Sequence, residues 1–209
     1  MSNHNLPKIM TSLRDIYNKN AEVFFRDRDK SLFEKTWLDI FIAELPHPGI
    51  VLDAGCGTGD PVARYLLSQN VKLKGIDFSK EMISLAKIHL PGFSCELQDM
   101  RELHFHYKFS GIIAWNSFFH LNFSDQLKTL SLFGDYLVDD GVFLFTAGPY
   151  RGEAWGKVGS DDVYHWSYSF EEYKKELELR NFEIIKVKLS DHLCNDHSVY
   201  LSKKRRNSY

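Results

Sequence analysis

The 209-residue chain has few cysteines, no excess of charge of one sign and no long apolar run. Its three cysteines, Cys56, Cys95 and Cys194, show neither disulfide-framework spacing nor zinc-ligand spacing. A formal net charge of −2 gives no basic field to hold nucleic acid or an anionic membrane. No apolar run reaches about 18 residues, and the N-terminus has no apolar signal core. These absences predict a globular protein of the reducing cytoplasm that binds neither membranes nor nucleic acid.

The remaining composition is ordinary for a globular domain, with 44% apolar and 26% charged residues. A length of 209 residues suits one domain with a full core. We expect a helical lid over residues 1–45, a core over residues 46–204 and a tail over residues 205–209. The one dense basic run, from Lys203 to Arg206, is predicted to be a solvated end of the chain.

The most informative stretch, residues 50–61, is an apolar run that ends at Asp53 and continues into three alternating glycines. Glycines let a buried strand turn sharply and let a ligand approach the backbone without a Cβ in the way. Asp60 is placed to cap a following helix with its carboxylate, and Pro61 suits the first helical position. The stretch therefore predicts a strand, a tight ligand-binding loop and the N-terminus of a helix.

This loop is a poor match to phosphate-binding loops. No Gly-Lys-Ser/Thr follows the glycines, and their positions at 55, 57 and 59 do not fit the dinucleotide pattern G-x-G-x-x-G. Asp53 and Asp60 would oppose a pyrophosphate, whereas an amino-acid zwitterion with a cationic centre suits them. The stretch resembles the first motif of the class I methyltransferases that use S-adenosyl-L-methionine (SAM), an apolar strand followed by D-x-G-x-G-x-G. The resemblance implies SAM as cofactor and S-adenosyl-L-homocysteine (SAH) as product.

Strand and helix signals alternate along the rest of the chain. Two helices, with a break at residues 26–30, are expected between residues 12 and 45. Residues 150–167 are expected to form a long loop. Further strands are predicted at residues 71–76, 93–97, 109–115, 142–146, 182–189 and 198–203, and helix starts at Ser79, Ser124 and Ser169. This alternation predicts an α/β fold with a doubly wound, mostly parallel seven-stranded sheet and a C-terminal antiparallel hairpin.

In open α/β sheets the ligand lies at the carboxyl ends of the strands, and the resemblance assigns roles there. Asp53 would meet the cofactor's ammonium, the amides of residues 55–57 its carboxylate, and Asp77 both ribose hydroxyls. Asp99 would take the adenine amino group, and Trp115 would present an aromatic face to the sulfonium. The full predicted cofactor set is Tyr17, Asp53, Ala54, Gly55, Cys56, Gly57, Asp77, Phe78, Ser79, Met82, Asp99, Met100, Trp115, Asn116, Ser117 and His120.

Two histidines are candidates for removing a proton from the methyl acceptor. His120 follows the fourth strand, where packing or contact with the cofactor is the alternative to catalysis. His165 lies in the expected aromatic loop, whose rings would line a pocket for an apolar or aromatic small molecule. Packing of those rings on the protein's own core is the alternative. The predicted acceptor residues are Tyr150, Trp155, Tyr164, His165 and Trp166.

The leading functional hypothesis is a SAM-dependent methyltransferase that acts on a small molecule, as a monomer or homodimer. A nucleic-acid or protein methyltransferase is the first alternative, but residues 116–119 lack the prolines of the N-P-P-Y/F-type motif of amino-methylating nucleic-acid enzymes. The broken glycine pattern opposes a hydride-transfer enzyme. A SAM-binding protein without catalysis stays open, because methyl transfer needs no obligatory catalytic residue. No clustered Asp/Asn set follows the fourth strand, so we expect no metal.

Overall fold

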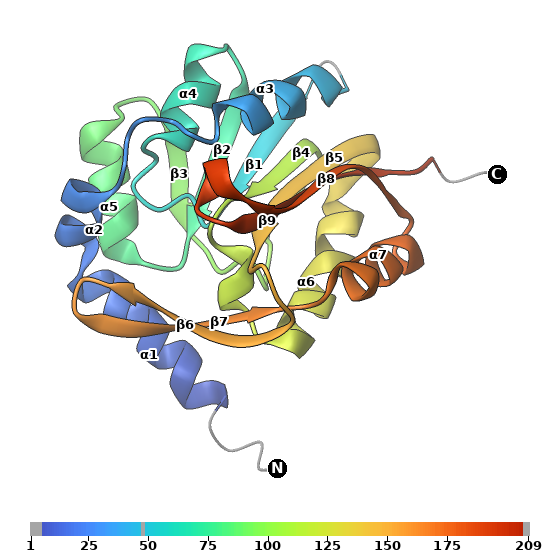
Figure 1. Ribbon diagram of the computed structural model, residues 1–209. Coiled ribbons are helices and arrows are strands. Elements are labelled where there is room, and N and C mark those ends of the chain that lie inside the picture. Colours follow the sequence, from blue (N-terminus) through green and yellow to red (C-terminus); the bar gives the residue numbers. More distant parts are fainter. Residues whose placement is uncertain (1–5, 47–48, 207–209) are drawn as a thin grey trace.

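The computed structural model describes residues 6–46 and 49–206, and its main feature is a seven-stranded sheet between two layers of helices (Figure 1). The strands are β1 (Ile50–Ala54), β2 (Lys72–Asp77), β3 (Ser94–Leu97), β4 (Phe109–Ala114), β5 (Leu137–Ala147), β8 (Phe182–Asp191) and β9 (His197–Lys204). They lie in the order β3-β2-β1-β4-β5-β9-β8. The first five of that order are parallel, while β9 and β8 form an antiparallel pair against β5. The predicted doubly wound sheet with a C-terminal antiparallel hairpin is confirmed.

The central strands are apolar because helices cover them on both faces. All six residues of β4 are buried, as expected for a strand inside a parallel sheet. The register pairs Ala54 of β1 with Ile76 of β2, and Asp53 of β1 with Ile113 of β4. These three strands therefore end at one edge of the sheet, which is where ligands bind in folds of this kind.

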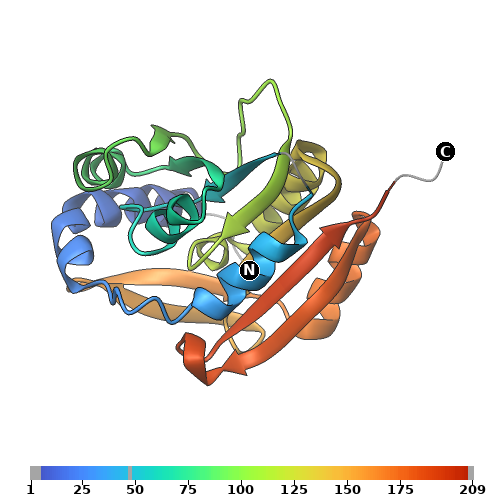
Figure 2. The ribbon, with the colours of Figure 1, turned by 90° about the horizontal axis from the view of Figure 1, so that it is seen from above.

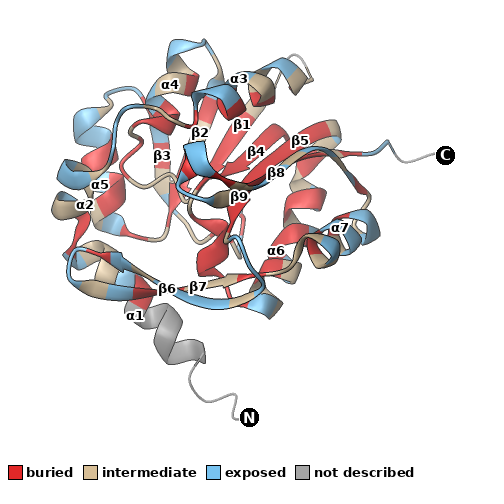
Figure 3. Ribbon diagram, viewed as in Figure 1, coloured by how far each residue is buried: buried red, intermediate tan, exposed pale blue. Residues whose placement is uncertain are grey.

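Each face of the sheet carries its own apolar core, visible as the buried centre of Figure 3. The covering elements are α3 (Lys35–Glu44), α4 (Val62–Ser68), α5 (Lys80–His89), α6 (Phe123–Tyr136), α7 (Phe170–Leu179) and the short 3-10 turns η1 (Phe118–His120) and η2 (His192–Cys194). Trp37, Leu66 and Ile83 from α3, α4 and α5 pack on one face. Phe133 and Tyr173 from α6 and α7 pack on the other. Burying one such side chain contributes roughly 1.5–3 kcal/mol.

Two further helices, α1 (Leu6–Lys19) and α2 (Ala21–Asp27), precede α3. The sequence predicts two helices between residues 12 and 45, but the structure has three, because the chain also breaks at Asn20. The Asn20 side-chain amide donates to the carbonyl of Ile16 and to the carboxylate of Asp161, a residue of a distant segment. This tertiary contact, which local periodicity does not report, marks the break. The other predicted break is found between α2 and α3.

Residues 150–167, expected as a long loop, instead contain an antiparallel hairpin of β6 (Gly152–Val158) and β7 (Asp161–Ser167). Val158 pairs with Asp161, so the turn has two residues, and Gly159 adopts a φ of +59° there. A two-residue Gly-Ser turn between runs rich in aromatic and β-branched residues is a hairpin signal, and the loop prediction is wrong because it overlooked that signal. Figures 1 and 2 show this second sheet apart from the first, with α1 beside it in Figure 1.

Two element boundaries also differ from the prediction. α4 begins at Val62 with Pro61 at its N-cap position, and Asp60 makes no capping hydrogen bond. The Asp60 carboxylate instead accepts from the Arg64 guanidinium at 3.2 Å, one helical turn later. β5 begins at Leu137 rather than at residue 142. Phe109 of β4 pairs with Leu137, and after a shift in register the regular pairing starts with Gly111 and Val142.

Within the basic run at the chain end, Lys203 and Lys204 belong to β9 and contact other elements rather than lying in a solvated tail as predicted, whereas the Arg205 and Arg206 side chains are 50% and 79% exposed. The buried Lys204 ammonium donates to the carbonyls of Gly134 and Leu137, at the end of α6. Lys203 forms an ion pair with Glu44 of α3 at 2.7 Å. Cations at a helix C-terminus satisfy carbonyls that the helix leaves free, which explains why this lysine can be buried.

Candidate functional site

A cavity of about 220 Å³ lies at the carboxyl ends of β1, β2 and β4. The loop after β1 lines it, and residues of α1, α2, η1 and the β6–β7 hairpin form further parts of its wall. Most of the predicted cofactor residues line it: Tyr17, Asp53, Gly55, Cys56, Gly57, Asp77, Phe78, Met82, Met100, Trp115, Asn116, Ser117 and His120. The fold thus brings the ends of several strands and the N-terminal helices to one site.

Asp53 ends β1 against this cavity and is only 3% exposed. No described residue donates a hydrogen bond to its carboxylate. Burial and the nearby Asp77 raise the pKa of Asp53 to about 7. An ionised carboxylate without a donor is costly to bury, so this position is complementary to a ligand that brings a positive charge.

The loop amides do not have the role expected of them. The N–H groups of Gly55 and Cys56 both donate to the carbonyl of Ile76, at 2.8 and 2.9 Å. The N–H of Gly57 donates to the Asp77 carboxylate at 2.9 Å. The prediction that amides 55–57 meet the ligand's carboxylate is therefore wrong for this structure, because the fold uses all three to join the loop to β2.

Glycine is required at position 55 for two reasons. Its φ is +82°, and a Cβ built there would lie 2.4 Å from the Cβ of Ser117. The Ser117 hydroxyl in turn donates to the carbonyl of Ala54 at 2.6 Å. The loop after β1 and the segment after β4 are thus in direct contact, and Ala54 itself is not among the residues that line the cavity.

Asp77, the last residue of β2, accepts hydrogen bonds from two backbone N–H groups. One carboxylate oxygen accepts from the N–H of Gly57 and the other from the N–H of Ser79. Burial raises the pKa of Asp77 to about 6, and these two hydrogen bonds oppose the shift. Ser79 does not line the cavity but caps α5, since its hydroxyl accepts from the N–H of Met82. The side chains of Phe78 and Met82 add apolar surface beside the acid.

Asp99 does not take the position expected of it. It is not among the cavity-lining residues, and both its carboxylate oxygens accept hydrogen bonds from the Arg101 guanidinium, at 3.0 and 2.7 Å. Arg101 also pairs with Asp125 of α6 at 3.1 Å. The carboxylate of Asp99 therefore serves an ion-pair network, while the neighbouring Met100 does line the cavity.

His120 is held at both ring nitrogens. Its Nδ1 lies 3.0 Å from the carbonyl oxygen of Tyr164, and its Nε2 lies 2.8 Å from the hydroxyl of Tyr17. A carbonyl only accepts, so Nδ1 carries the proton and Nε2 accepts from the Tyr17 hydroxyl. Burial, with the nearby His165, lowers the pKa of His120 to about 3. His120 is thus a neutral imidazole with both nitrogens engaged.

His165 lines the same cavity with its ring free of such contacts. No described residue forms a hydrogen bond with either of its ring nitrogens. Its ring centroid lies 4.5 Å from that of Phe119 and 4.8 Å from that of His120. Across the hairpin, Gly156 leaves room for the ring, since a Cβ there would lie 2.6 Å from its Cε1. Burial and His197 lower the pKa of His165 to about 4, so the ring is a neutral base near pH 7.

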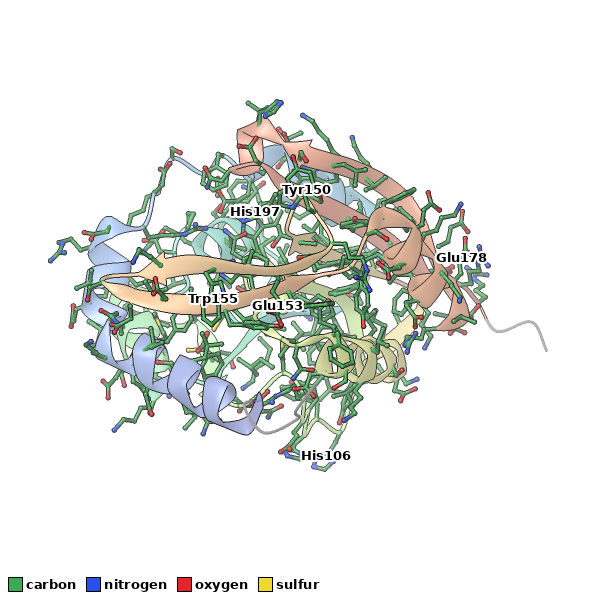
Figure 4. All side chains as sticks on the ribbon, turned by 60° about the horizontal axis from the view of Figure 1, so that its bottom comes forward. His106, Tyr150, Glu153, Trp155, Glu178 and His197 are labelled. Atoms are coloured by element: carbon green, nitrogen blue, oxygen red, sulfur yellow. The ribbon has the colours of Figure 1, made fainter. Side chains whose placement is uncertain are left out.

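The other predicted acceptor residues do not line the cavity. Tyr150 and Trp155 are 82% and 60% exposed, and Figure 4 labels both, with Trp155 on the hairpin. The Tyr164 hydroxyl donates to Glu153, and Trp166 packs against the ring of Phe123. Of the predicted acceptor residues only His165 lines the cavity, because strand alternation places Trp155, Tyr164 and Trp166 on the other face of the hairpin and Tyr150 lies before β6.

Several cavity residues were not predicted from the sequence. They are Phe24, Arg28, Thr58, Gly59, Asp60, Val62, Phe119, Lys157, Val158, Val163 and His197. Some follow directly from the loop motif, but Arg28 and His197 come from the α2–α3 connection and the start of β9 (Figure 4 labels His197). No local pattern marks either residue, so only the folded chain identifies them.

Among the described residues there is no cluster of three or more His, Cys, Asp or Glu side chains suited to hold a metal ion. A search of the same residues finds no helix both long and apolar enough to cross a membrane.

The comparisons with known proteins agree with this geometry. A family model described as "Methyltransferase domain" matches residues 51–141. The putative methyltransferase YqeM of Bacillus subtilis is 33% identical over 136 residues, which cover 62% of this chain and 54% of that protein. A dTDP-3-amino-3,4,6-trideoxy-alpha-D-glucopyranose N,N-dimethyltransferase of Streptomyces venezuelae is 24% identical over 119 residues, covering 56% and 50%. The chain spans about half the length of the curated relatives it matches.

Solved structures show the same fold. The 1,6-didemethyltoxoflavin-N1-methyltransferase of Burkholderia thailandensis superposes with a TM-score of 0.74 at 18% identity, over 99% of this chain and 92% of that one. The CcbJ methyltransferase of Streptomyces caelestis gives 0.73 at 15% identity, over 91% and 98%. At such identities the likeness concerns the fold alone. Together with the family match and the strand order, it shows that the chain has the class I methyltransferase fold, with a methyltransferase domain matched over residues 51–141.

Proposed function

We propose that this protein is a SAM-dependent methyltransferase that acts on a small-molecule acceptor. The observation that carries the proposal is the buried Asp53 carboxylate, which faces the cavity without a hydrogen-bond donor from any described residue. An amino-acid ammonium would supply the missing charge. SAM supplies such an ammonium together with a methyl group that its sulfonium already activates.

The other cavity residues fit the rest of that cofactor. Asp77 offers carboxylate oxygens suited to a ribose diol, and Phe78 and Met82 offer apolar surface suited to an adenine ring. The ring of Trp115 also lines the cavity, where an aromatic face attracts a cation. A pyrophosphate cofactor fits poorly, because Asp53 and Asp77 would repel it.

A small acceptor agrees with the size of the cavity, about 220 Å³, and with the elements that form its wall. The β6–β7 hairpin contributes Lys157, Val158, Val163 and His165 to the cavity wall, and α1 contributes Tyr17. Two structural neighbours support this class of substrate: an amino pentose methyltransferase bound to SAM, and a didemethyltoxoflavin methyltransferase bound to 1,6-didemethyltoxoflavin and SAH. We expect a monomer or homodimer in the cytoplasm, where the three free cysteines would stay reduced.

His165 is a better candidate than His120 for the general base that removes a proton from the methyl acceptor. Both nitrogens of His120 are engaged, so that residue would position Tyr17 and Tyr164 rather than move a proton. His165 is neutral near pH 7 and has free nitrogens in the cavity. Holding the acceptor beside this base provides both alignment and proton removal.

Isothermal titration calorimetry of the purified chain with SAM, SAH and NAD tests the cofactor assignment. We expect SAM and SAH to bind, and Asp53→Asn to weaken both by roughly 10-fold or more through loss of a charged hydrogen bond. Asp15→Asn, an exposed acid of α1, is the matched control and should bind as the unaltered protein does. Binding of NAD without SAM or SAH would overturn the proposal. Radiolabelled methyl transfer to a panel of small amines and phenols would then identify the acceptor.

A further inference from the structure

Three aromatic side chains from separate elements pack together where they line the cavity. Phe119 comes from η1, His165 from β7 and His197 from the first position of β9. The centroid of the Phe119 ring lies 4.5 Å from that of His165 and 5.3 Å from that of His197, on which it is stacked with an interplanar angle of 24°. Both imidazoles therefore pack against one phenyl ring, and we call these three residues the ring cluster.

The sheet places the ring cluster away from the acids that end β1 and β2. Ser198 pairs with Ala147, the last residue of β5, so His197 lies just past the carboxyl end of that strand (Figure 4 labels His197). The strand order puts β5 and β9 on one side of β4, and β1 and β2 on the other. Asp53 and Asp77 therefore lie on the side proposed for the cofactor, and the ring cluster lies on the side left for the acceptor.

Both imidazoles of the ring cluster are neutral and can accept a hydrogen bond. Burial, with the nearby His197, lowers the pKa of His165 to about 4, and no described residue bonds to its ring nitrogens. Burial also lowers the pKa of His197, and a hydrogen bond to the backbone of Cys194 opposes that shift. A backbone carbonyl only accepts, so the other nitrogen of His197 keeps its lone pair. Each imidazole thus offers one lone pair to a ligand that donates.

The charges that line this part of the cavity disfavour a cationic acceptor. The acids that line the cavity, Asp53, Asp60 and Asp77, all belong to β1, β2 or the loop after β1. Among the described residues, those that line it from η1, the hairpin and β9 include the Lys157 ammonium and no acid. An ammonium group bound against the ring cluster would lack a counter-charge there, and an unpaired charge is costly to bury.

We propose that the ring cluster binds the methyl acceptor, and that this acceptor is a planar aromatic molecule with two O–H or N–H donors and no ammonium group. The inference rests on the proposed function and deepens it. One donor is the group to be methylated and bonds to His165, while the second bonds to His197 and fixes the orientation of the acceptor. Planar rings suit this wall because aromatic pairs favour stacked and edge-to-face contacts.

The arrangement assigns the two histidines different tasks. The acceptor's oxygen or nitrogen forms its new bond to the methyl carbon as the methyl–sulfur bond breaks and sulfur keeps that electron pair. The acceptor's proton passes to His165, which is neutral and has a free nitrogen to receive it. His197 touches the second donor only, so its loss should affect the choice and alignment of the acceptor.

Calorimetry on the protein saturated with SAH measures binding of acceptor probes without turnover. The three isomeric benzenediols offer two donors at different spacings, phenol offers one, anisole offers none and benzylamine carries an ammonium. We expect at least one benzenediol to bind roughly 5- to 10-fold more tightly than phenol, the effect of one net hydrogen bond, and benzylamine to bind most weakly. His197→Phe keeps the stacked ring and removes both nitrogens. It should reduce the benzenediol preference to about 2-fold, which two equivalent hydroxyls give by statistics alone.

Matched variants separate hydrogen bonding from folding. His165→Phe should reduce the same preference and carries the test if His197→Phe does not fold, and the double variant should bind phenol and anisole alike. His106→Phe makes the same change at an exposed histidine that does not line the cavity, and should keep every preference. SAH affinity, measured first on each variant, should change by less than about 3-fold, because both residues lie on the acceptor side.

Several outcomes would overturn the inference. They are a benzenediol affinity no higher than that of phenol, tightest binding of benzylamine, or a preference that persists unchanged in both single variants. Binding of SAH without binding of any probe would also overturn it and would leave the proposed function standing. Failure of the unaltered protein to bind either SAM or SAH would instead refute the proposed function itself.

Discussion

Tyr17 and His120, 103 residues apart in the sequence, share a hydrogen bond of 2.8 Å between the phenol and the imidazole Nε2. The bond joins α1 to the turn after β4. A second hydrogen bond, from Nδ1 of the same imidazole to the carbonyl of Tyr164, joins that turn to the hairpin. Three separate parts of the chain thus converge on one neutral imidazole. The parts of the cavity wall formed by α1, η1 and the hairpin are therefore connected through His120.

Tyr17→Phe removes one hydrogen bond and leaves the buried Nε2 without a donor. We expect the free energy of unfolding to fall by about 1–2 kcal/mol, measured by urea denaturation. Tyr168→Phe is the control, because its hydroxyl donates to the carbonyl of Phe123 at an exposed site and its loss should have less effect. Equal losses in the two variants would show that the Tyr17 bond has no special contribution.

Asp161, at the tip of the hairpin, connects it to the junction of α1 and α2. Its carboxylate accepts from the Lys19 ammonium at 2.9 Å and from the Asn20 amide at 2.8 Å. Asp161→Ala should raise amide hydrogen exchange in β6 and β7 by roughly 10-fold, because the contact between the hairpin and the end of α1 is lost. Asp162→Ala, the adjacent acid, should leave exchange near α1 unchanged. Equal exchange in the two variants would show that the Asp161 contacts do not hold the hairpin to α1.

Asp53 makes the stability of the ligand-free protein depend on pH. Its folded pKa of about 7 lies well above the usual range of an aspartate carboxyl, so the folded state binds the proton more tightly. Stability therefore declines as the pH rises from about 4 to about 7, and is constant above that range. Asp53→Asn should remove part of this decline, on the order of 2 kcal/mol between pH 5 and pH 8. Denaturation curves at those two values would contradict the assignment if the variant kept the full decline.

The same carboxylate should make SAH affinity rise with pH. A ligand ammonium favours the ionised form of Asp53, so binding releases a proton wherever the free site is protonated. Calorimetry in two buffers of different ionisation enthalpy should detect uptake of that proton by the buffer at pH 6 and little at pH 8.5. Proton release that persists unchanged in Asp53→Asn would assign it to another group.

His165→Ala should lower the rate of methyl transfer by roughly 100-fold once an acceptor is identified, within the range for loss of general base catalysis. SAH affinity should stay nearly constant, which separates a catalytic defect from a binding defect. His106→Ala is the control, since His106 is an exposed histidine away from the hairpin (Figure 4). Unchanged turnover in His165→Ala would remove this histidine from the mechanism.

Much of this protein was determined by local sequence. Apolar runs specify the strands, because a parallel sheet covered on both faces must bury every residue of its centre. The glycine loop specifies the turn after β1, because Gly55 and its neighbours adopt backbone angles that other residues rarely tolerate. Since parallel strands end at one edge, these features also predict that Asp53 and Asp77 lie at one site.

Tertiary structure alone decided which groups remain free to bind. The carboxylate of Asp99 is engaged by Arg101, and the loop amides are used by β2. Arg28 enters the cavity wall from the connection after α2, where Glu34 fixes it. A donor that already makes a good hydrogen bond within the protein is not available to a ligand. Which partner it has depends on segments that come into contact only after folding. Residue order predicts where a polar group stands, whereas its availability for a ligand depends on the neighbours that packing supplies.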